Sequence, residues 1–180
     1  MHSAALLLLT ATIVLAQPLT IRVLDYVGIP GPVLRNFKSP ATVLFTDNGI
    51  ATKWRICRVA SDEGDCAPIQ DRDLFLKIVE HAPPTATSSA FGAAVMENGV
   101  SHFGYVFWGR VESAAERHGV SASIVLAHVV AHEVGHLLGL QHARTGLMRG
   151  QFEHLDLLQA AKGRLRFSAA ELGSMRNSLH

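Results

Sequence analysis

The fold of this chain is decided by the stretch His132-Glu-Val-Gly-His-Leu-Leu-Gly-Leu-Gln-His142. His132 and His136 are four residues apart, so on a helix of about 3.6 residues per turn their imidazoles share one face and can converge on one metal ion. Glu133 follows the first histidine, about 100° further around that helix. It can therefore stand beside the ion without binding it, where a general base is required.

The third histidine of the stretch depends on a glycine. On a continued helix His142 would lie about 240° around the axis from His136 and would point away from it. Gly139 can adopt the left-handed conformation that ends a helix, so the chain can reverse and bring His142 back as a third ligand. Three nitrogen ligands leave a fourth position open for water, which is the arrangement of catalytic rather than structural zinc sites.

Two other interpretations of the histidines are open. One is a buried helix whose histidines only fill the core, although five residues at set spacing favour a metal site. The other is a structural zinc domain, which requires a fourth protein ligand from Glu153 or His154. His128 lies one turn before His132, about 6 Å along the axis, and is interpreted as a core or supporting residue. Four other histidines have no ligand spacing, so a second, structural zinc is not expected: His81, His102, His118 and His154.

The stretch resembles the metzincin clan of zinc endopeptidases, and in particular small bacterial matrixin-like members without accessory domains. The resemblance rests on the HExxHxxGxxH pattern and on a methionine that follows it, Met148. It implies that His132, His136 and His142 are zinc ligands. It also implies that Glu133 is the base and that Met148 forms an apolar floor under the metal. The segment from His142 to Met148 is shorter than in typical matrixins, no tyrosine follows Met148, and no propeptide cysteine switch is present.

The resemblance also implies a fold and a function. We expect an α+β, zincin-like single domain over residues 17–180, with a twisted mixed sheet packed on a central zinc-binding helix and a helix at the carboxyl end. The implied function is a metalloendopeptidase with one catalytic zinc ion and a peptide or protein substrate. The alternative is a zinc-dependent peptide-binding module that does not cleave, a pseudoenzyme, which the intact Glu133 disfavours.

Composition is consistent with one globular domain. Apolar residues make up 48% of the 180 residues and charged residues 17%, which indicates a compact core rather than disorder. The formal net charge is +1, so composition gives no reason to expect nucleic acid or an anionic membrane as a partner. We expect a monomer.

The amino-terminal segment indicates export. Residues 4–16 form an apolar run that is too short for a bilayer, which requires about 20 residues, and small or apolar residues at 14–16 precede a cleavage position at Gln17. Residues 1–16 are therefore interpreted as a signal peptide of a secreted or periplasmic protein without stable membrane insertion, and an uncleaved anchor is the alternative. In an exported chain the two cysteines, Cys57 and Cys66, predict a disulfide; two free thiols are the alternative.

The hydrophobic pattern places the other elements. Strands are predicted at 19–26, 50–57, 71–80, 90–96 and 102–108. Helices are predicted at 33–46, 111–117, from Ser121 as N-cap to Gly139, and at 168–177, while 152–161 is helical or irregular. Pro40 either kinks the first helix or places its start at Ser39. The acidic run 61–65 is expected to be a loop, and its spacing disfavours calcium.

The small residues Gly92, Ala93 and Ala94 are candidate substrate-binding positions. In matrixin-like folds an edge strand at this place lines the cleft and pairs with the extended substrate backbone, which suits small side chains. An ordinary edge strand explains the same residues equally well.

Overall fold

The structure, a computed structural model, describes residues 17–179 except 48, 60, 62, 65, 67, 98 and 99. The predicted signal peptide at residues 1–16 lies outside the described residues. Within the described part of the chain, no helix combines the length and apolarity needed to cross a bilayer.

The strands form one mixed sheet of six strands in the order β3-β2-β1-β4-β6-β5. Their bounds are β1 (Leu19–Asp25), β2 (Thr52–Arg58), β3 (Glu63–Gly64), β4 (Leu74–Val79), β5 (Gly92–Glu97) and β6 (Val100–Phe107). The pairs β1–β2, β1–β4 and β4–β6 are parallel, whereas β5 runs antiparallel to β6 and forms an edge of the sheet. The predicted strands are present, with ends shifted by up to three residues.

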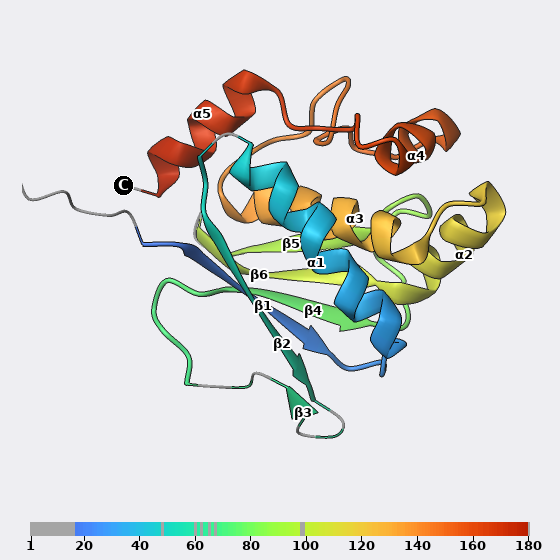
Figure 1. Cartoon of the computed structure of the whole chain (residues 1–180), viewed down its shortest axis with the longest axis horizontal. Coiled ribbons are helices and arrows are strands. Elements are labelled where there is room, and N and C mark those ends of the chain that lie inside the picture. The colour runs from blue at the N-terminus through green and yellow to red at the C-terminus, as the bar shows by residue number, and fades with distance from the viewer. Residues whose placement is uncertain are drawn as a thin grey trace, which may run out of the picture.

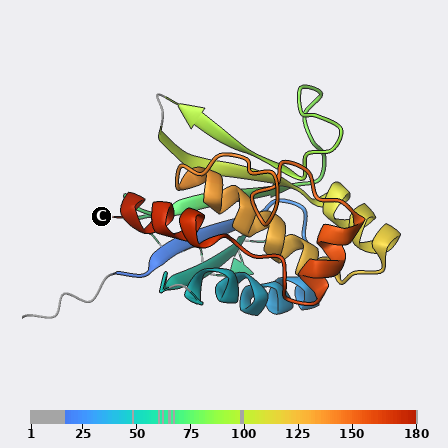
Figure 2. The same cartoon turned by 90° about the horizontal axis from the view of Figure 1, so that it is seen from above.

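The helices cover one face of this sheet (Figures 1 and 2). Their bounds are α1 (Gly31–Thr46), α2 (Trp108–His118), α3 (Ala122–Leu137), α4 (His154–Ala161) and α5 (Ala169–Ser178). Helix α3 packs against β4, β5 and β6 on one side and against α1, α2 and α4 on the others. The prediction of an α+β domain with a mixed sheet on a central helix is therefore confirmed.

Helix α1 runs from Gly31 to Thr46 with Pro40 in its interior, so the helix predicted over 33–46 is present and the alternative start at Ser39 is wrong. Pro32 in the first turn has a backbone angle that suits a helix start. The apolar face of α1 is buried at Leu34, Phe37, Ala41, Leu44 and Phe45. Burial of such side chains contributes roughly 1.5–3 kcal/mol each, which outweighs the roughly 3 kcal/mol that an interior proline costs.

The acidic run 61–65 is only partly a loop. Glu63 and Gly64 form β3, which pairs antiparallel with Arg58 and Cys57 of β2. The reason is the disulfide between Cys57 and Cys66, whose Cα atoms are 4.9 Å apart and which returns the chain alongside β2. The acidic residues 62 and 65, on which the calcium alternative depended, lie outside the described residues.

A buried ion pair fastens β1 to the chain that leads into β4. Arg22 Nε donates to Asp73 Oδ2 at 2.5 Å, and the two side chains are only 5% and 2% exposed. The same carboxylate oxygen accepts from the backbone of Gln70 at 3.0 Å. Each charge is thus satisfied by the other and by backbone groups, as burial of charge requires.

We expect Asp73→Ala to lower the free energy of unfolding by about 3 kcal/mol or more, because it leaves the Arg22 charge buried without its carboxylate. Urea unfolding measures the loss. The double variant Arg22→Met/Asp73→Leu, which removes both charges, should recover most of it. A loss below about 1 kcal/mol for Asp73→Ala would show that water reaches the pair.

Candidate metal centre

Helix α3 presents the site because it is buried on nearly all sides. Thirteen of its sixteen residues are buried, as its apolar sequence requires. Ser121 occupies the predicted N-cap position, but its side chain makes no capping hydrogen bond. Its Oγ lies 2.8 Å from Ser123 Oγ instead. The histidines of α3 are therefore carried on a rigid element that the core holds in place.

The chain reverses at Gly139, whose φ is +89°. The amide of Leu140 donates to Gly135 O and the amide of Gly139 donates to His136 O, both at 2.9 Å. These two bonds form a Schellman motif, in which a residue with positive φ ends the helix. The reversal returns the chain along α3 and allows His142 to approach the helix.

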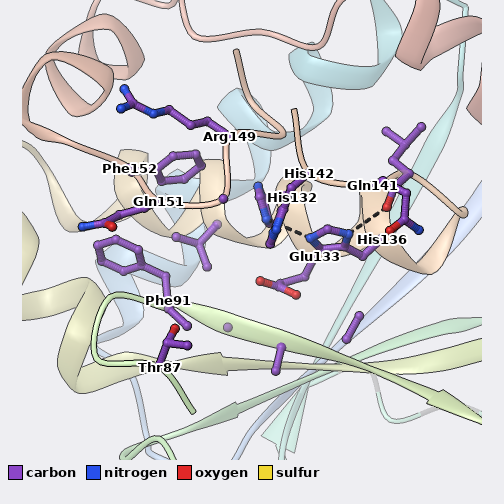
Figure 3. Close-up of a pocket in the computed structure, with 17 residues that line it drawn as sticks. Thr87, Phe91, His132, Glu133, His136, Gln141, His142, Arg149, Gln151 and Phe152 are labelled. Atoms are coloured by element: carbon purple, nitrogen blue, oxygen red, sulfur yellow. Dashed lines mark hydrogen bonds between the residues drawn. The ribbon is translucent and has the colours of Figure 1, made fainter. Parts of the chain in front are cut away.

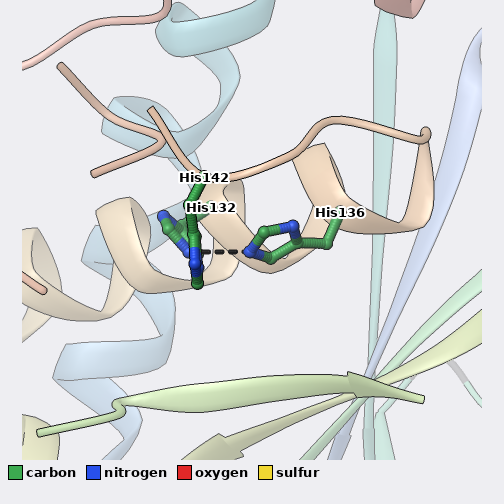
Figure 4. A group of neighbouring side chains, drawn as sticks. All are labelled: His132, His136 and His142. Carbon is green, nitrogen blue, oxygen red and sulfur yellow. Dashed lines mark hydrogen bonds between the residues drawn. The ribbon is translucent and has the colours of Figure 1, made fainter. Parts of the chain in front are cut away.

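Three imidazoles meet at this point (Figure 4). One ligating nitrogen from each of His132, His136 and His142 can be chosen so that all lie within 4.8 Å of one another. The Nε2 atoms of His132 and His136 are 3.0 Å apart. In the described part of the chain this is the one group of three or more potential ligands close enough to hold an ion.

Hydrogen bonds determine which nitrogens face the centre. His132 Nδ1 donates to Leu147 O at 2.7 Å, and His136 Nδ1 donates to Leu140 O at 2.8 Å. A carbonyl only accepts, so each Nδ1 carries the proton of the neutral ring and each Nε2 presents a lone pair. This is the outer hydrogen bonding of histidines that bind metals. The sequence analysis did not identify either carbonyl.

The donor set fits a divalent metal ion. Two lone pairs facing each other at 3.0 Å repel unless a proton or a metal ion lies between them. Burial, together with the charges of His136 and His142, lowers the pKa of His132 to about 4, which disfavours the proton at neutral pH. Imidazole nitrogens suit zinc and other late first-row metals, and three of them leave a coordination position open.

The segment after His142 closes under the site. Met148 is fully buried, and a Cβ at Gly135 would lie 2.6 Å from its Sδ. Gly135 therefore leaves the space that Met148 fills beneath α3. Gly150 plays a similar part for His142, since a Cβ there would lie 3.1 Å from the ring nitrogen Nδ1.

Glu133 points from α3 toward β5 (Figure 3). The residue is 4% exposed, and its Oε2 has no hydrogen-bond partner among the described residues. Burial raises the pKa of this carboxyl to about 8. Gly92 makes room for it, because a Cβ at Gly92 would lie 2.5 Å from Glu133 Oε1. The glycine proposed for substrate approach thus also accommodates the candidate base.

The histidines and Glu133 line a cavity of about 350 Å³. Its other side includes the predicted substrate positions Gly92, Ala93 and Ala94. The sequence analysis missed the aromatic residues of its wall, Phe91 and Phe152, whose ring centroids are 6.1 Å apart. Phe152 also packs edge-on against the ring of His132 at 5.6 Å. No local pattern marks these two residues, which are 61 positions apart.

The other candidate ligands lie elsewhere. Glu153 is the N-cap of α4 and pairs with Arg149, and His154 Nδ1 lies 2.9 Å from His118 Nδ1. Neither belongs to the group of three ligands. His128 is buried, and its Nδ1 donates to Ile124 O at 2.8 Å, which agrees with a core position.

Comparisons with known proteins identify the fold. The chain resembles a solved structure, the archaemetzincin from Methanopyrus kandleri. The two share 15% sequence identity with a TM-score of 0.57, and the match covers 90% of this chain and 96% of the archaemetzincin. This similarity confirms the predicted zincin-like fold. No protein-family model matches the chain, and no curated protein matches it in sequence.

We expect Gly92→Ala to destabilise the protein by about 1–3 kcal/mol or more. The added Cβ would lie 2.4 Å from Tyr105 O as well as 2.5 Å from Glu133 Oε1, so backbone has to move. Thermal unfolding measures the effect. Gly173→Ala is the matched control, because that position in α5 is open and alanine should stabilise the helix by about 0.5–1 kcal/mol. If the two variants unfold at the same temperature, Gly92 does not pack against Glu133 as described.

The raised pKa of Glu133 predicts a pH dependence of the metal-free protein. Its stability contribution is present below pH 4.5 and is lost as pH rises toward about 8, by up to about 1.4 kcal/mol per pH unit. The lowered pKa of His132 acts in the opposite direction, because it makes stability rise with pH between about pH 4 and 6.5. Stability should therefore fall between pH 6.5 and 8, and Glu133→Gln should flatten this fall.

Urea unfolding with a chelator measures this slope. Glu112→Gln is the control, because Glu112 lies on the exposed side of α2 and its removal should leave the slope unchanged. If Glu133→Gln unfolds with the same slope as the parent protein, the carboxyl is not buried as described.

Proposed function

We propose that this protein is a zinc-dependent metallopeptidase of the metzincin type that hydrolyses internal peptide bonds. The observation that supports this most directly is the grouping of His132, His136 and His142, with two Nε2 lone pairs directed at one point. Beside them Glu133 adjoins an open cavity. A metal site of three imidazoles with a free position and an adjacent carboxylate is the composition of a catalytic rather than a structural zinc centre.

In this proposal His132, His136 and His142 hold the zinc ion. When bound, zinc acidifies a water molecule and polarises the substrate carbonyl. Glu133 takes the proton of the attacking water and later transfers it to the leaving amine nitrogen. Its poorly solvated position makes the carboxylate a strong base, and a nearby cation favours its charged form. No covalent intermediate with the protein is needed.

The edge of the sheet provides a place for the substrate backbone. Strand β5 is paired on one side by β6, and its residues Gly92, Ala93 and Ala94 line the cavity beside the histidines. An extended peptide can add to such an edge through main-chain hydrogen bonds. Phe91 and Phe152 supply an apolar surface for one substrate side chain. The matrixin-like type is part of the proposal and rests on the motif and the small size of the domain.

Export is the second part of the proposal. The disulfide between Cys57 and Cys66 fits a protein that folds in an oxidising compartment. Together with the predicted signal peptide at residues 1–16, it favours a secreted or periplasmic peptidase. That the protein acts as a monomer stays a prediction.

We expect Glu133→Ala to retain one zinc ion per chain, because the three ligands remain. Its peptidase rate should fall about 10²–10⁴-fold, because the base is removed. His142→Ala should instead lose zinc. Metal analysis after dialysis and a quenched-peptide assay, with and without chelator, measure the two properties. His81→Ala is the control, since His81 is exposed and outside the site, and it should retain both.

Full activity of Glu133→Ala would contradict the assigned base. If His142→Ala still binds zinc and Glu153→Ala does not, the third ligand is Glu153 and not His142. If the parent protein holds zinc and binds peptides without cleaving them, the peptide-binding module is the correct function.

A further inference from the structure

A second cavity, of about 400 Å³, adjoins the first. The two share Phe91, Gln151 and Phe152 in their linings. Figure 3 shows these three residues together at one end of the metal cavity, opposite His136 and Gln141. A substrate that lies along the metal cavity and extends past this end would therefore enter the second cavity.

The second cavity differs from the first in charge. Its lining contains Arg110, Arg117 and His118 of α2 and no acidic residue, and hydroxyl groups come from Ser88, Ser89 and Ser113. The whole chain has a formal net charge of only +1. Two arginines in a polar hollow without a carboxylate thus create a local positive potential, and such a hollow concentrates anionic groups.

The two arginines differ in their hydrogen bonds. Arg110 Nη1 donates to Thr87 O at 2.7 Å and to Ala90 O, and its guanidinium lies 5.4 Å from the centre of the Phe107 ring. These bonds hold the loop before β5 against α2 and occupy donors of Arg110. Arg117 is exposed and has no hydrogen-bond or ion-pair partner in the part of the chain that the structure describes. Its full set of donors is available to a ligand.

We propose that the second cavity is a subsite that binds a carboxylate of the peptide substrate, with Arg117 as the residue that contacts it. The proposal rests on the peptidase function proposed above. A guanidinium binds a carboxylate through two parallel hydrogen bonds, and the serine hydroxyls can donate to the same oxygens. The carboxylate is either an Asp or Glu side chain of the substrate or the free carboxyl terminus of a short peptide.

A simpler role for Arg117 is to offset the partial negative charge at the carboxyl end of α2, since it lies in the last turn of that helix. This role adds a small stabilising interaction at the end of the helix. It predicts no effect on which peptides bind, so a binding experiment separates the two roles.

The experiment uses zinc-loaded Glu133→Gln protein, which should bind peptides without cleaving them, and three fluorescent peptides of one sequence. The first has no acidic side chain and an amidated end, the second has glutamate for glutamine at one position and an amidated end, and the third has no acidic side chain and a free carboxyl terminus. The position of the glutamate is moved along the peptide in a series. Fluorescence anisotropy gives the dissociation constants.

We expect at least one acidic or free-carboxyl peptide to bind about five- to tenfold more tightly than the neutral one. The preference should weaken at raised ionic strength. Adding Arg117→Gln should abolish the preference, and Arg117→Lys should retain part of it because the charge remains without the planar fork. Arg164→Gln is the matched control, because Arg164 is exposed and does not line either cavity.

Equal affinity for all peptides, no binding at all, or a preference that survives Arg117→Gln overturns the subsite. A preference for the glutamate peptides identifies an acidic side chain as the ligand, and a preference for the free terminus identifies the terminal carboxylate. Cleavage of the neutral peptide by the parent protein is measured separately. It tests the peptidase function alone, so failure of one proposal is distinguishable from failure of the other.

Discussion

Two hydrogen bonds from histidine rings to backbone carbonyls constrain the rest of the site. His132 donates to Leu147 O and His136 donates to Leu140 O, so both acceptors lie beyond the end of α3. The bonds can form only if the chain turns back at Gly139 and the segment up to Met148 packs under the helix. In return they direct both Nε2 atoms to one point. The end of the helix, the burial of Met148 and the orientation of the two imidazoles therefore depend on one another.

The position of Glu133 depends on how closely α3 approaches the sheet. Gly92 on β5 and Gly104 on β6 both face this residue, and a Cβ on Gly104 would lie 2.7 Å from Leu76 Cδ2 and 3.6 Å from Glu133 Cβ. The absence of side chains at these positions leaves space for a buried carboxylate. That burial raises its pKa, which is unfavourable for folding at neutral pH but suits a base.

Phe152 connects the metal centre to the shape of the binding surface. Its ring packs against His132, and with Phe91 it separates the two cavities. One side chain thus packs against a candidate ligand and lines both the metal cavity and the basic cavity beside it. Changes in the loop that carries Phe152 would therefore alter the candidate metal site and the shape of both cavities together.

The sequence alone determined the features that depend on local spacing. They are the grouping of His132 and His136, the reversal at Gly139, the helix predicted at 168–177 and the alternation of the strands, all of which follow from helix or strand geometry. Tertiary structure decided the rest. The antiparallel return at β3, the helix that continues through Pro40, the space that Gly92 leaves for Glu133 and the wall of Phe91 and Phe152 depend on contacts between residues far apart in the chain. Such contacts form because the burial of apolar side chains and the disulfide outweigh the local preference for secondary structure. Periodicity in the sequence does not predict them.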